Sequence, residues 1–431
     1  MYFLLQNCRF EDGSEGALLV RDGLVKERLA PDATAPARAR TINVEGRLVI
    51  PAFACAHLHA CKAFWSDPLG HQRAEVRSMP RFEAASHVKR AYLEEEVESR
   101  VDRALELAAR HGTGALRLFC DVDKNAGLRA FHGLMHAVRR WKDVLRLQVV
   151  AFPQDGLDTE LLAKALDLGA TVLGGIPFIE KAPEQREAHA KACFDLAVER
   201  DVDLHFVVDD TIDPAINTLE FIARLAIDRG WEGRVAATQC ASLAHLKDED
   251  AARVIQLVKD AGITVVSNPH VGLVCHSGPG SPQPRGVTRW RELVAAGVPM
   301  ACAQDDIDSW FYPFGANDPL QVGLLAAHAF PLAWGTELRQ LLSWLTTSPA
   351  QFLGWRRHGL EAGCEASFVV LDAPDWRTAL QYQSDKLLVV LNGRPVAASR
   401  TRARTLSLER EPRDSDWDYF LSYWRGSEGG V

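Results

Sequence analysis

Apolar strands and amphipathic helices alternate through the middle of this chain, and this alternation constrains the fold more than any other feature. Eight apolar runs are typical of strands: residues 48–53, 115–120, 145–152, 171–177, 203–208, 234–238, 263–267 and 299–303. Periodic amphipathic segments separate them, among them residues 93–110, 184–200, 248–260 and 289–296. Eight strand–helix units in a row predict an α/β fold of the (β/α)8 TIM-barrel class.

Both ends of the chain are rich in short strands joined by turns. Near the C-terminal end, Asn392-Gly393 stands between two apolar runs, which is a strong hairpin signal. We therefore expect a small β-sandwich domain built from both termini. The expected division is residues 1–48 plus 356–410 for the β domain, 49–355 for the barrel, and 411–431 for a tail that docks on its own barrel or on a neighbouring subunit.

Composition excludes several classes of partner. Of the 431 residues, 47% are hydrophobic and 25% are charged, and the formal net charge is -8. The chain has no basic tract, so nucleic acid and anionic membranes are poor candidate partners. The nine cysteines are scattered without a CxxC pair, and no signal peptide is evident. These features predict a cytoplasmic protein with a small-molecule substrate, and they leave a homo-oligomer open.

The first barrel strand ends in a His-X-His motif, His57-Leu58-His59. Side chains two residues apart on a strand point the same way, so both imidazoles converge on one point. Two converging imidazoles are what a metal ion needs, although two histidines also end strands for purely structural reasons. Strand ends of α/β barrels are where ligands collect, which favours a metal site.

Two further strand ends carry metal-binding residue types. His205 lies on the fifth expected strand and Asp305 follows the eighth, so both would open onto the same face as the His-X-His pair. Three imidazoles and one carboxylate suit a single divalent ion such as Zn, Fe or Mn. Asp306 is the rival to Asp305, and it would otherwise orient a ligand or meet the substrate.

With these residues in place, the chain resembles the amidohydrolase superfamily, and within it the cytosine-deaminase-like branch. The resemblance covers nearly the whole chain and rests on the motifs at residues 151–156, 174–178, 267–269, 284–288, 305–306 and 312–315. Members hydrolyse C–N bonds of small nitrogen heterocycles with water activated by one divalent metal. The resemblance implies His57, His59, His205 and Asp305 as metal ligands. It also implies Gln154 as a hydrogen-bonding partner of the heterocycle.

Two proton-carrying residues of that family pattern are missing. The histidine expected after the sixth strand is replaced by Gln239, which hydrogen-bonds but carries no proton near neutral pH. The glutamate expected three residues after His205 is replaced by Val208. If two residues are inserted after His205, then Asp210, or else Asp209, stands where the glutamate does. The catalytic set is therefore expected to be Asp305, Asp210 and Gln239.

Other mouth residues have changed toward apolar types. Phe119 stands where relatives often have a histidine, and Cys61 stands where they often have an aspartate. We expect Phe119 and Lys62 to contact the substrate together with Gln154 and Asp306. This pattern predicts a drier and less basic pocket than that of an ordinary deaminase.

Three functions remain open at this point. The first is a metal-dependent amidohydrolase with shifted acid–base residues. The second keeps the metal site for a non-hydrolytic reaction, as in a lyase, decarboxylase, hydratase or isomerase acting on a small cyclic compound. The third is a catalytically degenerate paralogue that binds a ligand.

Overall fold

The structure is a computed structural model, and it describes residues 2–65, 79–276 and 283–399. The expected tail at residues 411–431 lies outside this described part. So do the last residues of the C-terminal segment assigned to the β domain, from 400 to 410.

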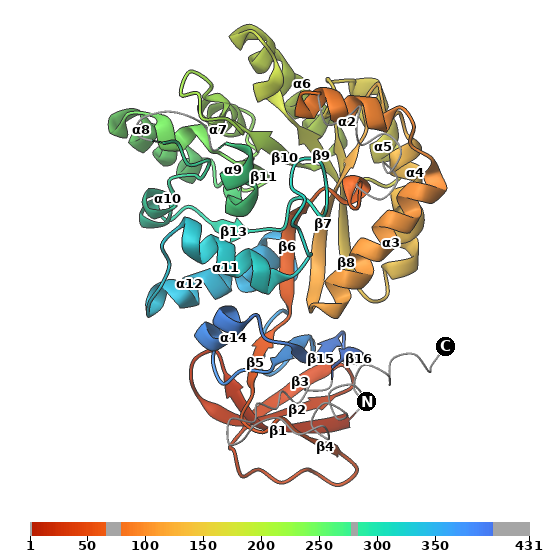
Figure 1. Ribbon diagram of the computed structural model, residues 1–431, viewed down its shortest axis with the longest axis vertical. Coiled ribbons are helices and arrows are strands. Elements are labelled where there is room, and N and C mark those ends of the chain that lie inside the picture. The colour runs from red at the N-terminus through yellow and green to blue at the C-terminus, as the bar shows by residue number, and fades with distance from the viewer. Residues whose placement is uncertain (1, 66–78, 277–282, 400–431) are drawn as a thin grey trace, which may run out of the picture. The chain divides into compact units, whose positions relative to one another are not determined.

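Eight parallel strands form the barrel that the alternation predicts (Figure 1). In spatial order they are β6 (Phe53–Leu58), β7 (Thr113–Asp121), β8 (Arg146–Phe152), β9 (Val172–Gly175), β10 (Asp203–Val208), β11 (Val235–Gln239), β12 (Thr264–Ser267) and β13 (Met300–Cys302). Every residue of β6, β7 and β11 is buried. Burial on both faces explains why these strands are near-continuous apolar runs in the sequence.

Helices lie outside the barrel strands, as Figure 1 shows. The longer ones are α2 (Arg81–Lys89), α3 (Glu94–Arg110), α4 (Arg129–Trp141), α5 (Thr159–Asp167), α6 (Pro183–Arg200), α7 (Thr218–Asp228), α8 (Asp248–Asp260), α11 (Pro319–Ala329) and α12 (Thr336–Leu345). The shorter ones are α9 (Pro269–Cys275), α10 (Trp290–Ala296), α13 (Thr347–Phe352) and α14 (Trp376–Tyr382), with 3-10 turns η1 (Ala60–Lys62), η3 (Pro177–Ile179) and η4 (Ser242–His245). Within the described residues, none of these helices is both long and apolar enough for a bilayer span.

A second sheet is built from both ends of the chain, as expected. Its strands are β1 (Tyr2–Phe10), β2 (Glu15–Arg21), β3 (Leu24–Leu29), β4 (Arg40–Asn43), β5 (Leu48–Pro51), β14 (Phe368–Leu371), β15 (Lys386–Leu391) and β16 (Arg394–Ala398). The strand expected at 48–53 is two strands in the structure. β5 pairs with β1 and β14 in the terminal sheet, and the barrel begins only with β6. The apolar run is continuous, so the sequence pattern hides the change of sheet.

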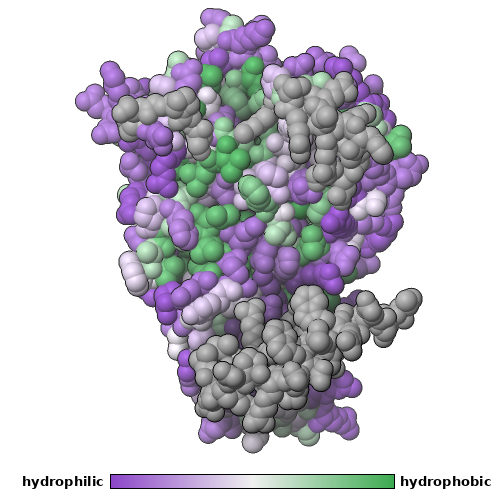
Figure 2. Space-filling model, viewed as in Figure 1, coloured by the Kyte–Doolittle hydropathy of each residue, from purple (hydrophilic) through white to green (hydrophobic). Residues whose placement is uncertain are grey.

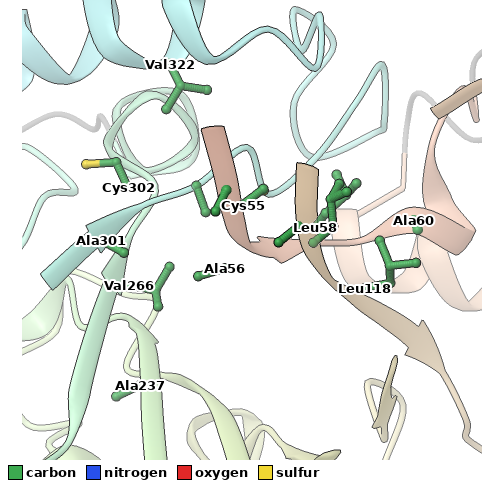
Figure 3. Close-up of a cluster of buried hydrophobic side chains, with 14 of the residues drawn as sticks. Cys55, Ala56, Leu58, Ala60, Leu118, Ala237, Val266, Ala301, Cys302 and Val322 are labelled. Atoms are coloured by element: carbon green, nitrogen blue, oxygen red, sulfur yellow. The ribbon is translucent and has the colours of Figure 1, made fainter. Parts of the chain in front are cut away.

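The barrel core is made of small and branched apolar side chains. Figure 3 shows Ala56 of β6 near Val266 of β12 and Ala301 of β13, and Leu58 of β6 toward Leu118 of β7. Hydrophilic side chains dominate the outer rim of the barrel in Figure 2. The apolar interior holds the strand ends in a fixed ring, and that ring positions the polar residues described next.

Candidate metal centre and active-site cavity

Closure of the barrel brings the first and last strands together at one point. The backbone N–H of Asp305 donates to the carbonyl of His57 at 3.0 Å, and the N–H of His59 donates to the carbonyl of Asp305 at 2.7 Å. Asp305 takes a left-handed backbone conformation there, with φ at 64°. His57 and His59 lie almost 250 positions from Asp305 in the sequence. Backbone hydrogen bonds, rather than flexible side chains, hold them beside Asp305.

Three of the four predicted metal ligands form a compact group. Asp305 Oδ1 lies 3.3 Å from His57 Nε2 and 3.5 Å from His59 Nε2, and all three residues are buried. His57 Nε2 has no hydrogen-bond partner within the described residues. A buried unpaired nitrogen is costly, and a metal ion would satisfy it.

Electrostatics favours the ligand form of this triad. Burial, and then the positive charge of Lys62, lowers the pKa of His59 well below its usual value, so the imidazole stays neutral. Burial works to raise the pKa of Asp305, but the neighbouring His57 and His59 bring it well below the usual value overall. A neutral imidazole and an ionised carboxylate are the forms that bind a divalent cation. The residues present therefore fit such an ion.

His205 lies beside the triad, but both of its ring nitrogens contact other side chains. Its Nε2 is 2.6 Å from Thr238 Oγ1, and its Nδ1 is 3.3 Å from Nη1 of the buried Arg117. A guanidinium group only donates hydrogen bonds, so Nδ1 is the acceptor and Nε2 of the neutral ring carries the proton. In this arrangement neither ring nitrogen of His205 is free to bind a metal. The sequence pattern gave no sign of this because Arg117 and Thr238 come from two other strands.

The second oxygen of Asp305 is held by two side-chain amides. Gln239 Nε2 donates to Asp305 Oδ2 at 2.6 Å, and Asn268 Nδ2 donates to the same oxygen at 2.9 Å. The two amides leave Oδ1 to face the histidines. Gln239 therefore hydrogen-bonds, as expected, but its partner is a metal-site carboxylate. Asn268 was missed by sequence reasoning, although its place directly after β12 put it on the same ring of strand ends.

A cavity opens beside the triad. Its polar lining residues are His59, Lys62, Gln154, Asp210, Gln239, Asp305 and Asp306. Its other lining residues are Phe82, Phe152, Ile176, Phe178, Val207, Val271, Cys275 and Phe311. Polar groups that converge among aromatic side chains are typical of a site for a small planar molecule.

Lys62 orients the amide of Gln154 within this cavity. The Lys62 ammonium donates to Gln154 Oε1, and it lies 3.5 Å from Asp121, which also faces Lys89. Lys89 in turn pairs with Asp123 at 2.7 Å. Because the carbonyl of Gln154 is used in this way, its amide nitrogen is left to donate to a ligand.

Phe119 does not reach this cavity, in contrast to the expected substrate contact. Its ring centroid lies 4.0 Å from that of His57 and 4.8 Å from that of His205. The residue belongs to an apolar cluster with Phe152 and Val207. It packs against the histidine rings, and Phe152 and Val207 line the cavity in its place.

The stretch after His205 separates into three different environments. Val208 packs in the main core, while its neighbour Val207 lines the cavity. Asp209 accepts hydrogen bonds from the backbone N–H groups of Thr218 and Leu219 at the start of α7, and burial raises its pKa to about 6. Of the two aspartates that could have replaced the missing glutamate, only Asp210 lines the cavity.

Asp306 also lines the cavity. Burial, and then the charge of Asp305, raises the pKa of Asp306 well above its usual value.

Cys240 is buried, and burial raises the pKa of its thiol well above the usual value, so it is an unreactive apolar residue.

Known proteins resemble this chain over most of its length. The sequence pattern of the amidohydrolase family matches residues 68–397. The chain is 30% identical to N-isopropylammelide isopropyl amidohydrolase of Pseudomonas sp. (strain ADP), over 82% of this chain and 87% of that protein. It is 32% identical to pterin deaminase of Rhizobium rhizogenes (strain K84), over 90% of this chain and 89% of that protein.

Among solved structures, 5-methylcytosine deaminase from Klebsiella pneumoniae, liganded with 5-fluorocytosine, superposes with a TM-score of 0.86 at 26% identity. The match covers 94% of this chain and 99% of that one. N-isopropylammelide isopropylaminohydrolase from Burkholderia multivorans shows the same fold, with a TM-score of 0.79. The resemblance seen in the sequence is therefore confirmed, and the chain belongs to the amidohydrolase family.

Proposed function

We propose that this protein is a metal-dependent hydrolase that cleaves a C–N bond of a small nitrogen heterocycle. The observation that carries the proposal is the buried triad of His57, His59 and Asp305, of which His59 and Asp305 line a small cavity. The two relatives at 30% and 32% identity are, by name, an N-isopropylammelide isopropyl amidohydrolase and a pterin deaminase. The first name describes a hydrolase, and the second describes the removal of an amino group.

The triad residues would hold one divalent ion, with Zn, Fe and Mn as the candidates. When bound, such an ion lowers the pKa of a water molecule toward about 7 and so supplies a nucleophile. Three protein ligands with an open position are the usual arrangement of catalytic zinc sites. His205 would join as a fourth ligand only by releasing Thr238.

The remaining cavity residues are suited to holding a planar ring. The amide nitrogen of Gln154 and the ammonium of Lys62 donate toward a ring carbonyl or ring nitrogen. Phe152 and Phe178 form an apolar wall that excludes water and strengthens these hydrogen bonds. The chain thus binds and orients the heterocycle from one side, while the triad lies on another.

A non-hydrolytic reaction is the second candidate, and one observation favours it. Val208 lies in the core and Gln239 is bonded to Asp305, so neither residue at the positions of the usual proton carriers transfers a proton. A metal without those carriers still acts as a Lewis acid in a lyase, decarboxylase, hydratase or isomerase.

The test combines metal analysis with a labelled-water assay. Purified protein is loaded with Zn, Fe or Mn and incubated in H₂¹⁸O with cytosine, pterin and N-isopropylammelide. Hydrolysis releases ammonia or amine and places ¹⁸O in the ring product, and His59→Ala should abolish both signals. A product formed without release of ammonia or amine supports the second candidate. Stoichiometric metal with no product from any of the three rings contradicts the proposed substrate class, and failure to bind any metal leaves the ligand-binding paralogue.

A further inference from the structure

We propose that Asp210, held by His276, is the proton-transferring group of this cavity. The inference rests on the proposed hydrolytic function and deepens it. It names a catalytic residue and a positioning residue that compensate for the missing glutamate and histidine. His276 follows helix α9 rather than a strand, so the pattern of strand-end residues did not include it.

Asp210 and His276 form a carboxylate–imidazole pair at the mouth of the site. Asp210 follows β10, and His276 follows α9, 66 residues further along the chain. His276 Nε2 donates to Asp210 Oδ1 at 2.6 Å, a distance typical of a strong charge-assisted hydrogen bond. Both side chains are mostly buried, with exposed fractions of 22% for Asp210 and 17% for His276.

Asp210 stands where the inner cavity meets a larger outer cleft. It lines the inner cavity together with Gln239, Asp305 and Asp306. It also lines the outer cleft, which Gln154 and Phe178 share. A ring bound between Gln154 and the triad therefore has the carboxylate of Asp210 on its entrance side, where a leaving amine would depart.

Two neighbouring carboxylates, those of Asp305 and Asp209, already accept other hydrogen bonds. Asp305 Oδ2 accepts from two amides, and its Oδ1 faces two histidines. Asp209 accepts three hydrogen bonds at the start of α7. Asp210 is the remaining carboxylate of this loop that reaches the cavity.

The chemistry needs one proton to be moved twice. As the C–O bond forms between water and the ring carbon, the Asp210 carboxylate takes a proton from that water. As the C–N bond breaks, Asp210 returns this proton to the departing nitrogen, which leaves as ammonia or an amine. The carboxylate is regenerated, and no oxidant or further reactant is required. His276 keeps its Nε2–H on Oδ1 throughout, which leaves Oδ2 of Asp210 to carry the proton.

The kinetic test uses the metal-loaded full chain and whichever ring the labelled-water assay identifies. Asp210→Asn should lower kcat by about 10²–10⁴-fold and leave KM and metal content nearly unchanged, because a general acid–base group contributes that much. Asp210→Glu should recover part of the rate. The matched control is Asp213→Asn, because Asp213 is an exposed carboxylate in the same loop.

His276 is tested through the two ways of replacing its donor. His276→Gln keeps an N–H donor and should retain more of kcat than His276→Leu, with KM alike in both. Equal rates in these two variants contradict the positioning role. A full rate in Asp210→Asn, or a loss seen only in Asp306→Asn, overturns the assignment to Asp210.

A second measurement needs no substrate. In protein labelled with ¹⁵N-histidine, the Nε2 proton of His276 should resonate downfield because of the hydrogen bond to a carboxylate, and Asp210→Asn should move it upfield. An unchanged resonance shows that the pair does not form. Wild-type enzyme that turns over no ring defeats the proposed function and this catalytic role with it, whereas the resonance reports on the pair alone.

Discussion

The two sides of the cavity match the family pattern to different degrees. On the side formed by β6 and the end of β13, His57, His59 and Asp305 stand as the family pattern requires. On the side formed by β10 and β11, the positions expected to carry protons hold Val208 and Gln239. One side keeps the groups that fit a metal, and the other has lost the groups that move protons.

The two sides also differ in what fixes their side chains. The triad is fixed by the backbone hydrogen bonds that close the barrel and by the two amides on Asp305. β10 is likewise held by backbone pairing with β9 and β11, so the difference lies in what its side chains contact. Val208 packs in the core, and Asp209 accepts hydrogen bonds at the N-terminus of α7. Acid–base chemistry then depends on another carboxylate that lines the cavity, such as that of Asp210.

The contrast between the two sides is tested most strongly by measuring metal affinity in two histidine variants. His59→Ala should weaken metal binding by about 10²–10⁴-fold, because a metal site worth about 10–16 kcal/mol shared over three protein ligands loses roughly 3–5 kcal/mol with one of them. His205→Ala should weaken it by less than about tenfold, because Thr238 and Arg117 already occupy its ring nitrogens. Competition with a chelator of known affinity measures both.

His245→Ala serves as the control, because His245 lies on η4 and does not line the cavity. Equal losses in His59→Ala and His205→Ala would show that His205 gives up Thr238 when the metal binds. The two sides would then share the metal, and the contrast between them would narrow.

Putting the family's glutamate back at position 208 is expected to fail. Val208→Glu places a carboxylate in the main core, where Val208 has no exposed surface. An unpaired buried carboxyl should lower the free energy of unfolding by about 3 kcal/mol or more. Val208→Thr is the isosteric control and should lose less. Urea denaturation measures both, and a Glu variant as stable as wild type and more active would place position 208 at the cavity after all.

The sequence predicted the barrel because buried parallel strands and amphipathic helices each leave a periodic pattern. It predicted the triad because strand ends in a barrel share one face. Hydrogen bonds between neighbouring strands leave no such pattern, which is why the engagement of His205 by Thr238 and Arg117 was not foreseen. The roles of Asp209 and Asp210 differ for a similar reason, since one residue along a loop decides whether a carboxylate meets a helix or a cavity.

The pH dependence of stability should report on Asp209. Its pKa is about 6 in the folded protein, and it is about 3.9 in an unfolded chain. The protonated carboxyl therefore stabilises the fold at pH values below the unfolded pKa, and this contribution is lost as pH rises through about 6. Relative to Asp209→Asn, wild type should lose about 3 kcal/mol between about pH 4 and pH 8. Denaturation of both proteins across this range measures the difference, and parallel curves would contradict it.

The smallest expected effect concerns Gln239, the residue that connects the two sides. Gln239→Leu removes one of the two amides on Asp305 Oδ2 and leaves only Asn268 to orient the carboxylate. Groups that orient a metal ligand typically contribute about 10–100-fold to affinity, and with Asn268 still in place the loss should lie near tenfold. Chelator competition measures it, with Gln256→Leu on the exposed face of α8 as control. If affinity is unchanged in Gln239→Leu, the backbone closure of the barrel and Asn268 together fix Asp305. The metal side would then be independent of the residue at position 239.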